Sequence, residues 1–127
     1  MRREFALPEE DEEFLESLGI QWETIREGGA QWLLLHDFPY PDGYNHAVGS
    51  IAIAIPSGYR TAQLDMAYFN PALVRLDGIP LKQTQVVQQI DGKQWQRWSR
   101  HYSWRAGIDW LATHIAHIKN WLAAGLQ

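Results

Sequence analysis

The side chains best suited to chemistry lie between residues 95 and 105, which read WQRWSRHYSWR. Ser99 and His101 are two residues apart there, so on an extended segment both side chains would project to the same side. A serine hydroxyl becomes a useful nucleophile only when a base removes its proton. The spacing therefore predicts Ser99 as nucleophile and His101 as its base, with Ser103 as a weaker second candidate. On a helix Ser99 and His101 would not face each other, and the pairing would fail.

Arginines and tryptophans surround this pair. Arg97 and Arg100 could hold a carboxylate, because a guanidinium grips carboxylates through two parallel hydrogen bonds. Trp95, Trp98 and Trp104 allow two interpretations. They could pack into the core or a lid, or they could contact a partner, since Trp and Arg are enriched at binding hot spots. The alternative for the whole segment is a loop packed by its tryptophans, with solvated arginines.

Composition restricts the chemistry. The 127 residues include no cysteine, which excludes disulfides, thiolate zinc sites and a thiol nucleophile. A hydrophobic fraction of 46% and seven tryptophans favour a folded chain, and a net charge of -4 does not favour nucleic acid as a partner. The apolar runs are too short for a signal peptide or a membrane span. We therefore expect a cytoplasmic protein that binds neither membranes nor nucleic acid.

No cofactor or metal is expected. Gly28-Gly29 is typical of a hairpin turn, and no phosphate-binding motif is present, so nucleotide chemistry should belong to a partner. His114 and His117 are three residues apart on a predicted helix, a spacing that could hold one metal ion. A third ligand could come only from Asp109 or His101. Two ordinary histidines on a polar-aromatic helix face are the favoured interpretation.

The pattern of elements predicts an α+β fold in one domain over residues 1–127. Pro8 and the acidic run at 9–13 indicate a helix start whose acids face solvent, although they could instead dock a basic partner. Apolar residues at helical spacing predict a second helix over 107–124. Between the helices, strand-like runs predict a four-stranded antiparallel meander, followed by an irregular stretch over 70–94; the four strands are expected at 20–27, 30–38, 46–55 and 63–69.

In this order, the elements resemble those of the ubiquitin-conjugating enzyme superfamily. More narrowly, the chain is similar to the prokaryotic conjugating-like family of bacterial ubiquitin-like modification operons, over roughly residues 7–123. Ile55-Pro56 through Tyr59 matches the Phe-Pro…Tyr-Pro turn of conjugating enzymes, and Tyr59 is then expected to pack under the active-site region. Asp91-Gly92 matches the pair that precedes their cysteine. Trp104 and the apolar helix after it match their Trp-Ser-Pro and the following helix.

Two departures from that family bear on function. The resemblance places the catalytic cysteine at or near Trp95, and this chain has no thiol there. The His-Pro-Asn motif is expected in 80–90, where LKQTQVVQQI contains neither His nor Asn. The resemblance implies as partners a ubiquitin-like modifier protein and its activating enzyme. It leaves two expectations: a modifier held on Ser99 as an oxyester, or a catalytically inactive adaptor that binds the modifier or the activating enzyme.

Overall fold

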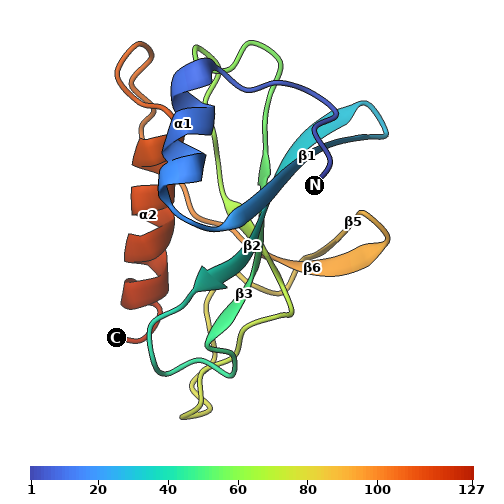
Figure 1. Ribbon diagram of the computed structural model, residues 1–127. Coiled ribbons are helices and arrows are strands. Elements are labelled where there is room, and N and C mark those ends of the chain that lie inside the picture. The colour runs from blue at the N-terminus through green and yellow to red at the C-terminus, as the bar shows by residue number, and fades with distance from the viewer.

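The computed structural model describes residues 1–127 as two helices and one curled antiparallel sheet (Figure 1). The helices are α1 (Glu9–Ser17) and α2 (Leu111–Ala124). The strands are β1 (Gln21–Glu27), β2 (Ala30–Pro39), β3 (Val48–Ala54), β4 (Ala67–Asn70), β5 (Val87–Ile90) and β6 (Lys93–Trp98). The α+β class is therefore confirmed.

The sheet has six strands in the order β1-β2-β3-β4-β6-β5, so the prediction of four strands was wrong. The missing pair is the β5–β6 hairpin, which lies partly within the stretch 70–94 that we expected to be irregular. Asp91 and Gly92 form its two-residue turn with φ of 54° and 72°, the conformation that a tight hairpin requires. Only Ile90 of β5 is buried, so this strand carries no alternating apolar pattern in the sequence.

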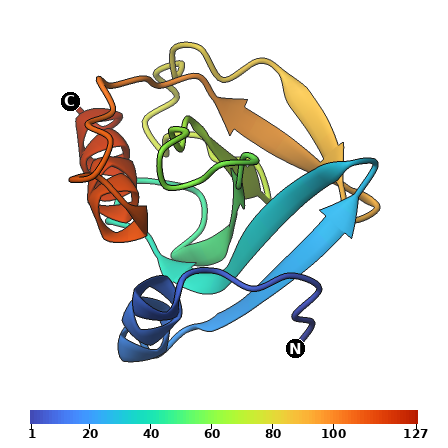
Figure 2. The same ribbon diagram turned by 90° about the horizontal axis from the view of Figure 1, so that it is seen from above.

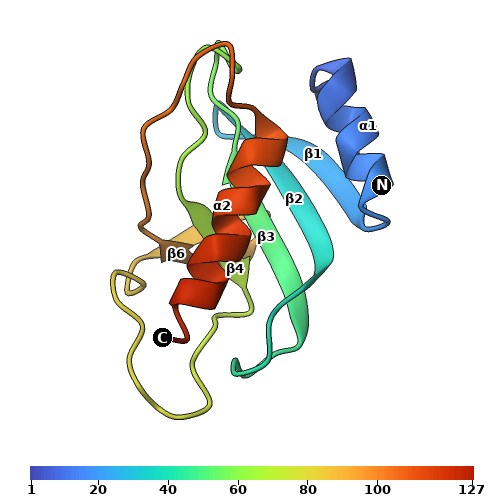
Figure 3. The same ribbon diagram turned by 90° about the vertical axis from the view of Figure 1, so that its left-hand side faces the viewer.

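Both helices cover the same face of the sheet, where the larger hydrophobic core lies (Figures 2 and 3). The apolar stripe predicted for α2 is buried there; its members are Leu111, Ile115, Ile118 and Leu122. The helix begins at Leu111 rather than 107. Asp109 accepts hydrogen bonds from the backbone N–H and the guanidinium of Arg105, which holds a turn over 105–109 and leaves Ile108 exposed. Neither helix has the length and hydrophobicity that a membrane crossing requires.

The opposite face curls around a second, smaller core. Its seven buried residues come from all the strands: Ile25, Trp32, Leu34, Ala52, Tyr68, Ile90 and Trp95. Arg2 bridges the two ends of the curl, because its guanidinium contacts Glu23 of β1 at 3.0 Å and Asp91 of the β5–β6 turn at 2.6 Å. The hydrogen bond from Arg2, together with one from His36, lowers the pKa of Glu23 to about 2. These bonds join the two edges of the curled sheet.

The N-terminal residues lie along the outer edge of β1. The backbone N–H of Glu4 donates to the Thr24 carbonyl at 2.9 Å, and the Thr24 N–H donates to the Arg2 carbonyl at 3.1 Å. The Arg3 guanidinium donates to the Trp22 carbonyl, and the Glu4 carboxylate accepts from the Arg26 N–H at 2.7 Å. The outward-facing backbone groups from Trp22 to Arg26 are thus occupied.

Asp11 of α1 is fully buried, although the acidic run that contains it was predicted to face solvent. Its carboxylate accepts a hydrogen bond of 2.5 Å from the Tyr59 hydroxyl and pairs with the Arg60 guanidinium. A buried carboxylate with two such partners fixes the segment after β3 against α1. The Arg60 carbonyl in turn accepts from the Trp104 indole N–H at 3.0 Å, and the Tyr59 and Trp104 rings lie 6.4 Å apart.

Candidate active site

Ser99 and His101 lie on an extended segment that leaves β6 and runs beside α2 (Figure 3). The Ser99 hydroxyl is 3.3 Å from Nε2 of His101, so the extended conformation does place the two side chains within reach. On the other side of the ring, Nδ1 of His101 lies 2.8 Å from a carboxylate oxygen of Asp65. Three residues thus form a serine–histidine–aspartate chain.

Asp65 was not predicted from the sequence. It lies just before β4, which pairs with β6 so that Ala67 is opposite Trp98. That antiparallel register brings the residues before Ala67 close to the residues after Trp98, and so brings Asp65 to His101. Finding Asp65 would have required knowing the β4–β6 pairing, and β6 was not predicted as a strand.

The chemistry of the three groups fixes the proton on the imidazole. A carboxylate only accepts hydrogen bonds, so Nδ1 of His101 carries the ring proton and donates it to Asp65. Nε2 is then free to accept the Ser99 proton, the arrangement in which histidine acts as general base for a hydroxyl. The His101 side chain is 62% exposed, which places the site at the surface, where a large substrate can reach it.

Strained backbone flanks the site on both sides. The Ser99 N–H donates to the carbonyl of Gln83 at 3.0 Å, and Gln83 has a φ of 57°. Met66, directly after Asp65, has a φ of 55°. Left-handed conformations are unfavourable for residues other than glycine, and they tend to occur where the surrounding structure needs one particular geometry. Gln83 binds the Ser99 N–H and Met66 is the chain neighbour of Asp65, so both positions adjoin the serine–histidine–aspartate chain.

His114 connects α2 to the same region. Its Nε2 donates to the Met66 carbonyl at 2.9 Å, and its Nδ1 accepts from the Tyr102 hydroxyl at 2.7 Å. The Tyr102 ring stacks on His117 with centroids 3.7 Å apart. Because both ring nitrogens of His114 are engaged, neither is free to bind a metal ion jointly with His117. The polar-aromatic stripe of α2 therefore supports the backbone beside Asp65.

The stability of the protein should fall in mild acid because of His114. Burial lowers its pKa from 6.5 to about 4. As the pH falls below 6.5, the unfolded chain binds a proton on this residue and the folded chain does not. The contribution of His114 to the free energy of unfolding is therefore at its maximum above pH 6.5. It should decrease by about 3 kcal/mol as the pH falls from 6.5 to 4. Urea denaturation across this range measures the slope.

The matched variants for that measurement are His114→Gln and His46→Gln. His114→Gln should be less stable than the unmodified protein at pH 7.5 but should show a flatter pH dependence below 6.5. His46 makes no side-chain hydrogen bond, so His46→Gln should retain the full slope. An unchanged slope in His114→Gln would contradict this assignment.

Ser99 and Arg100 line a cavity of about 520 Å³ between the loop after β4 and the end of α2. Arg75 and Lys82 also line it, together with apolar residues that include Ile79 and Trp121. No aspartate or glutamate is among its lining residues. Ser99 therefore lines a cationic cavity that could receive an anionic or extended ligand.

Comparison with known families adds one finding to this geometry. The family model described as "Prokaryotic E2 family E" matches residues 7–125. This chain belongs to prokaryotic E2 family E. No curated protein and no solved structure gives a match. The family and the fold agree with the conjugating-like resemblance seen in the sequence, and no residue of this chain can supply the thiol of a conjugating enzyme.

In this family E protein, Trp95 occupies the position at which the resemblance to conjugating enzymes places the catalytic cysteine. Trp95 lies inside strand β6. Trp95 of β6 is 2% exposed in the smaller core, and its indole N–H donates to the Ile90 carbonyl at 2.9 Å. Trp98 is fully buried on the opposite face, with its ring 4.9 Å from that of Phe69. The packing interpretation therefore applies to both tryptophans, and neither side chain is available to a partner in this conformation. The family's nucleophile position and Ser99 do not coincide.

The other predicted contact residues differ in accessibility. Trp104 is half-buried against Tyr59, and Arg100 is half-buried in the cavity wall. Arg97 points to the curled face beside Tyr68, and its Nε is buried without a hydrogen-bond partner. Only Arg100 among these lines the cavity that Ser99 lines. The structure therefore brings Ser99, Arg100 and His101 together and separates them from Arg97.

Two further features of the family E fold lie apart from Ser99. Ser50, His36 and Glu23 form a second hydrogen-bonded chain, with 2.9 Å from Ser50 to Nδ1 of His36 and 2.7 Å from Nε2 to Glu23. None of the three lines a cavity, and Glu23 is also bound by Arg2, so this chain joins strands β1, β2 and β3. A larger cavity of about 710 Å³ reaches Asp65 but neither Ser99 nor His101.

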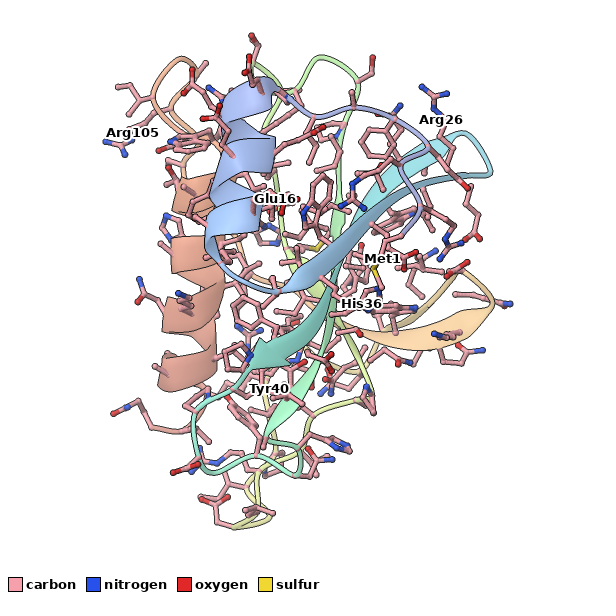
Figure 4. All side chains as sticks on the ribbon, viewed as in Figure 1. Met1, Glu16, Arg26, His36, Tyr40 and Arg105 are labelled. Atoms are coloured by element: carbon pink, nitrogen blue, oxygen red, sulfur yellow. The ribbon has the colours of Figure 1, made fainter.

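Figure 4 shows where four labelled side chains lie on the molecule. Arg26 points outward at the far end of β1, Tyr40 lies at the end of β2, and Arg105 projects from the loop before α2. His36 lies on the sheet, at a distance from Arg105. His36 and Arg105 therefore lie in different parts of the molecule.

Proposed function

We propose that this conjugating-like protein receives a ubiquitin-like modifier from an activating enzyme and holds the modifier's C-terminal carboxyl group on Ser99 as an oxyester. The observation that supports the proposal is the hydrogen-bonded chain from Ser99 through His101 to Asp65. Membership in a prokaryotic E2 family supports the conjugating role. A cysteine-free chain needs another nucleophile, and Ser99 is the serine that combines a base with an adjoining cavity.

In the proposed reaction, Nε2 of His101 takes the Ser99 proton while Oγ attacks the carbonyl carbon of the activated modifier. The tetrahedral intermediate collapses as the bond to the leaving group breaks, and His101 returns its proton to that group or to solvent. Asp65 stabilises the imidazolium form of His101 during these steps. In the second half-reaction an amine of the target attacks the oxyester, and Ser99 leaves as an alcohol.

Incubating the protein with its activating enzyme, the modifier and ATP tests this function. Intact-mass analysis should show one modifier attached by a bond that hydroxylamine or base cleaves. Ser99→Ala should lose the adduct completely. Ser103→Ala is the matched control, because Ser103 is exposed on the same segment and makes no hydrogen bond to a histidine. An adduct that survives Ser99→Ala would overturn the assignment of Ser99.

A second candidate is a catalytically inactive adaptor that binds the modifier or the activating enzyme. It is favoured by exposed apolar side chains on the loop after β4: Val74 (55%), Leu76 (72%) and Ile79 (53%). Clustered exposed apolar residues are typical of interaction sites. Modifier binding that is equal in the unmodified protein and in Ser99→Ala, with no adduct formed, would support this function. Leu76→Ser should then weaken the binding.

A further inference from the structure

Three cations line the cavity beside Ser99, and two of them form no ion pair. Arg75 is occupied, since its guanidinium pairs with Asp77 at 2.6 Å and donates to the Gly125 carbonyl at 3.0 Å. Arg100 and Lys82 form no ion pair. With no acidic side chain among the lining residues, these two positive charges face the cavity next to the proposed nucleophile.

Arg100 is the more informative of the two cations because it is half-buried. Its guanidinium lies 5.1 Å from the ring centroid of Trp98, and its one hydrogen bond goes to the Ser99 carbonyl at 3.1 Å. Burial without a counter-charge disfavours the charged form and lowers the pKa of Arg100. A guanidinium held in this way gains most from a phosphate or carboxylate that accepts its remaining donors.

Resting on the proposed acylation of Ser99, we propose that its acyl donor is an acyl phosphate, a mixed carboxylic–phosphoric anhydride, whose phosphoryl group is bound by Arg100 and Lys82. This donor class differs from a thioester in one respect that matters for this cavity. The leaving group of a thioester is a thiol, which presents no phosphate oxygens for the two cations to bind. A serine hydroxyl is also a weaker nucleophile than a thiolate, so a better leaving group compensates.

The step balances without any further reactant. Ser99 Oγ forms a bond to the acyl carbon as its proton passes to Nε2 of His101. The bond from the acyl carbon to the bridging oxygen then breaks, and the phosphate leaves with that oxygen and the electron pair. Arg100 and Lys82 neutralise the charge that develops on the leaving phosphate, which lowers the barrier. The products are the Ser99 oxyester, free phosphate and a proton on His101.

Two small acetyl donors test the donor class on the complete chain. Acetyl phosphate carries the phosphoryl group, and S-acetyl-N-acetylcysteamine carries the same acyl group as a neutral thioester. Ser99 acetylation is followed by intact mass and peptide mapping, and hydroxylamine separates the ester from acetylated lysines. We expect acetyl phosphate to acetylate Ser99 at least ~10-fold faster than the thioester at equal concentration.

Variants of the cations then separate binding of the phosphoryl group from general effects. Arg100→Gln should slow the reaction with acetyl phosphate by ~10-fold or more beyond any effect that it has on the thioester reaction. Lys82→Gln should act in the same direction with a smaller effect, because Lys82 is exposed. Lys119→Gln is the control, since Lys119 is exposed on α2 outside the cavity. Inorganic phosphate should inhibit the unmodified protein and not Arg100→Gln.

The outcomes distinguish this inference from the function on which it rests. If the thioester reacts as fast as acetyl phosphate, or if Arg100→Gln slows both donors equally, the acyl-phosphate donor is overturned while acylation of Ser99 stands. If neither donor acetylates Ser99 and the activating-enzyme reaction also gives no Ser99 adduct, the proposed function itself is overturned.

Discussion

Asp65→Asn is expected to slow acylation of Ser99 on the order of 100-fold while the fold stays intact. The carboxylate accepts the Nδ1 proton of His101 at 2.8 Å and so selects the tautomer whose Nε2 faces Ser99. An asparagine can donate to Nδ1 instead, which would put the ring proton on Nε2 and remove the base. We expect a rate loss at the low end of the range for general base catalysis, because the His101 side chain is 62% exposed and water weakens its interactions.

Single-turnover acylation rates, with the adduct quantified by mass, measure this effect. His101→Gln should slow the reaction to a similar extent, and the double variant Asp65→Asn/His101→Gln should be no slower than His101→Gln alone, because Asp65 acts through His101. Asp42→Asn is the matched control, since Asp42 is exposed and forms no ion pair. Additive losses in the double variant would show that Asp65 acts independently of the imidazole.

Trp98→Ala is expected to lower the free energy of unfolding by about 4 kcal/mol. The side chain is fully buried between the sheet and α2, where its ring meets Phe69 at 4.9 Å and Tyr44 at 6.0 Å. Its indole N–H also donates to the Gln96 amide oxygen at 2.9 Å, so truncation leaves a large cavity and removes one of the two hydrogen bonds that this oxygen accepts. Urea or guanidinium denaturation followed by tryptophan fluorescence measures the loss.

This expectation changes how a binding experiment on Trp98 is to be interpreted. Loss of modifier binding in Trp98→Ala would follow from a weakened fold as well as from a lost contact, so this result alone would not support the adaptor function. Trp104→Ala serves as the comparison, because Trp104 is half-buried and should cost less. If Trp98→Ala were as stable as the unmodified protein and yet lost a partner, the buried position of Trp98 would be contradicted.

Sequence reasoning located most of the elements, because amphipathic helices and alternating strands leave a periodic signal. The α2 stripe from Leu111 to Leu122 is of this kind. The first four strands were predicted from strand-like runs between turn residues, and the fourth was expected at 63–69 but is observed at Ala67–Asn70. The β5–β6 hairpin escaped notice although its Asp91-Gly92 turn was identified. Three of the four β5 residues are exposed, so burial imposes no apolar alternation on them. Strands held mainly by backbone pairing cannot be predicted from hydrophobic pattern.

The candidate site was predictable only where its members are neighbours in the chain. Ser99 and His101 are two residues apart, so an extended conformation suffices to pair them. Asp65 lies 36 residues away from His101, and Asp11 meets Arg60 from 49 residues away. Both contacts depend on the tertiary arrangement. The tryptophans were ambiguous because the same residue types fill cores and form interfaces.

The N-terminal segment along β1 has a consequence for how this molecule can associate with other chains. Exposed strand edges are templates for strand addition and for aggregation. Because the backbone groups from Trp22 to Arg26 are already bonded to residues 2–4, that edge offers little for an incoming strand. The other edge is β5, a strand of only four residues that carries two glutamines. Self-assembly through extended cross-strand pairing is thereby limited to a very short template.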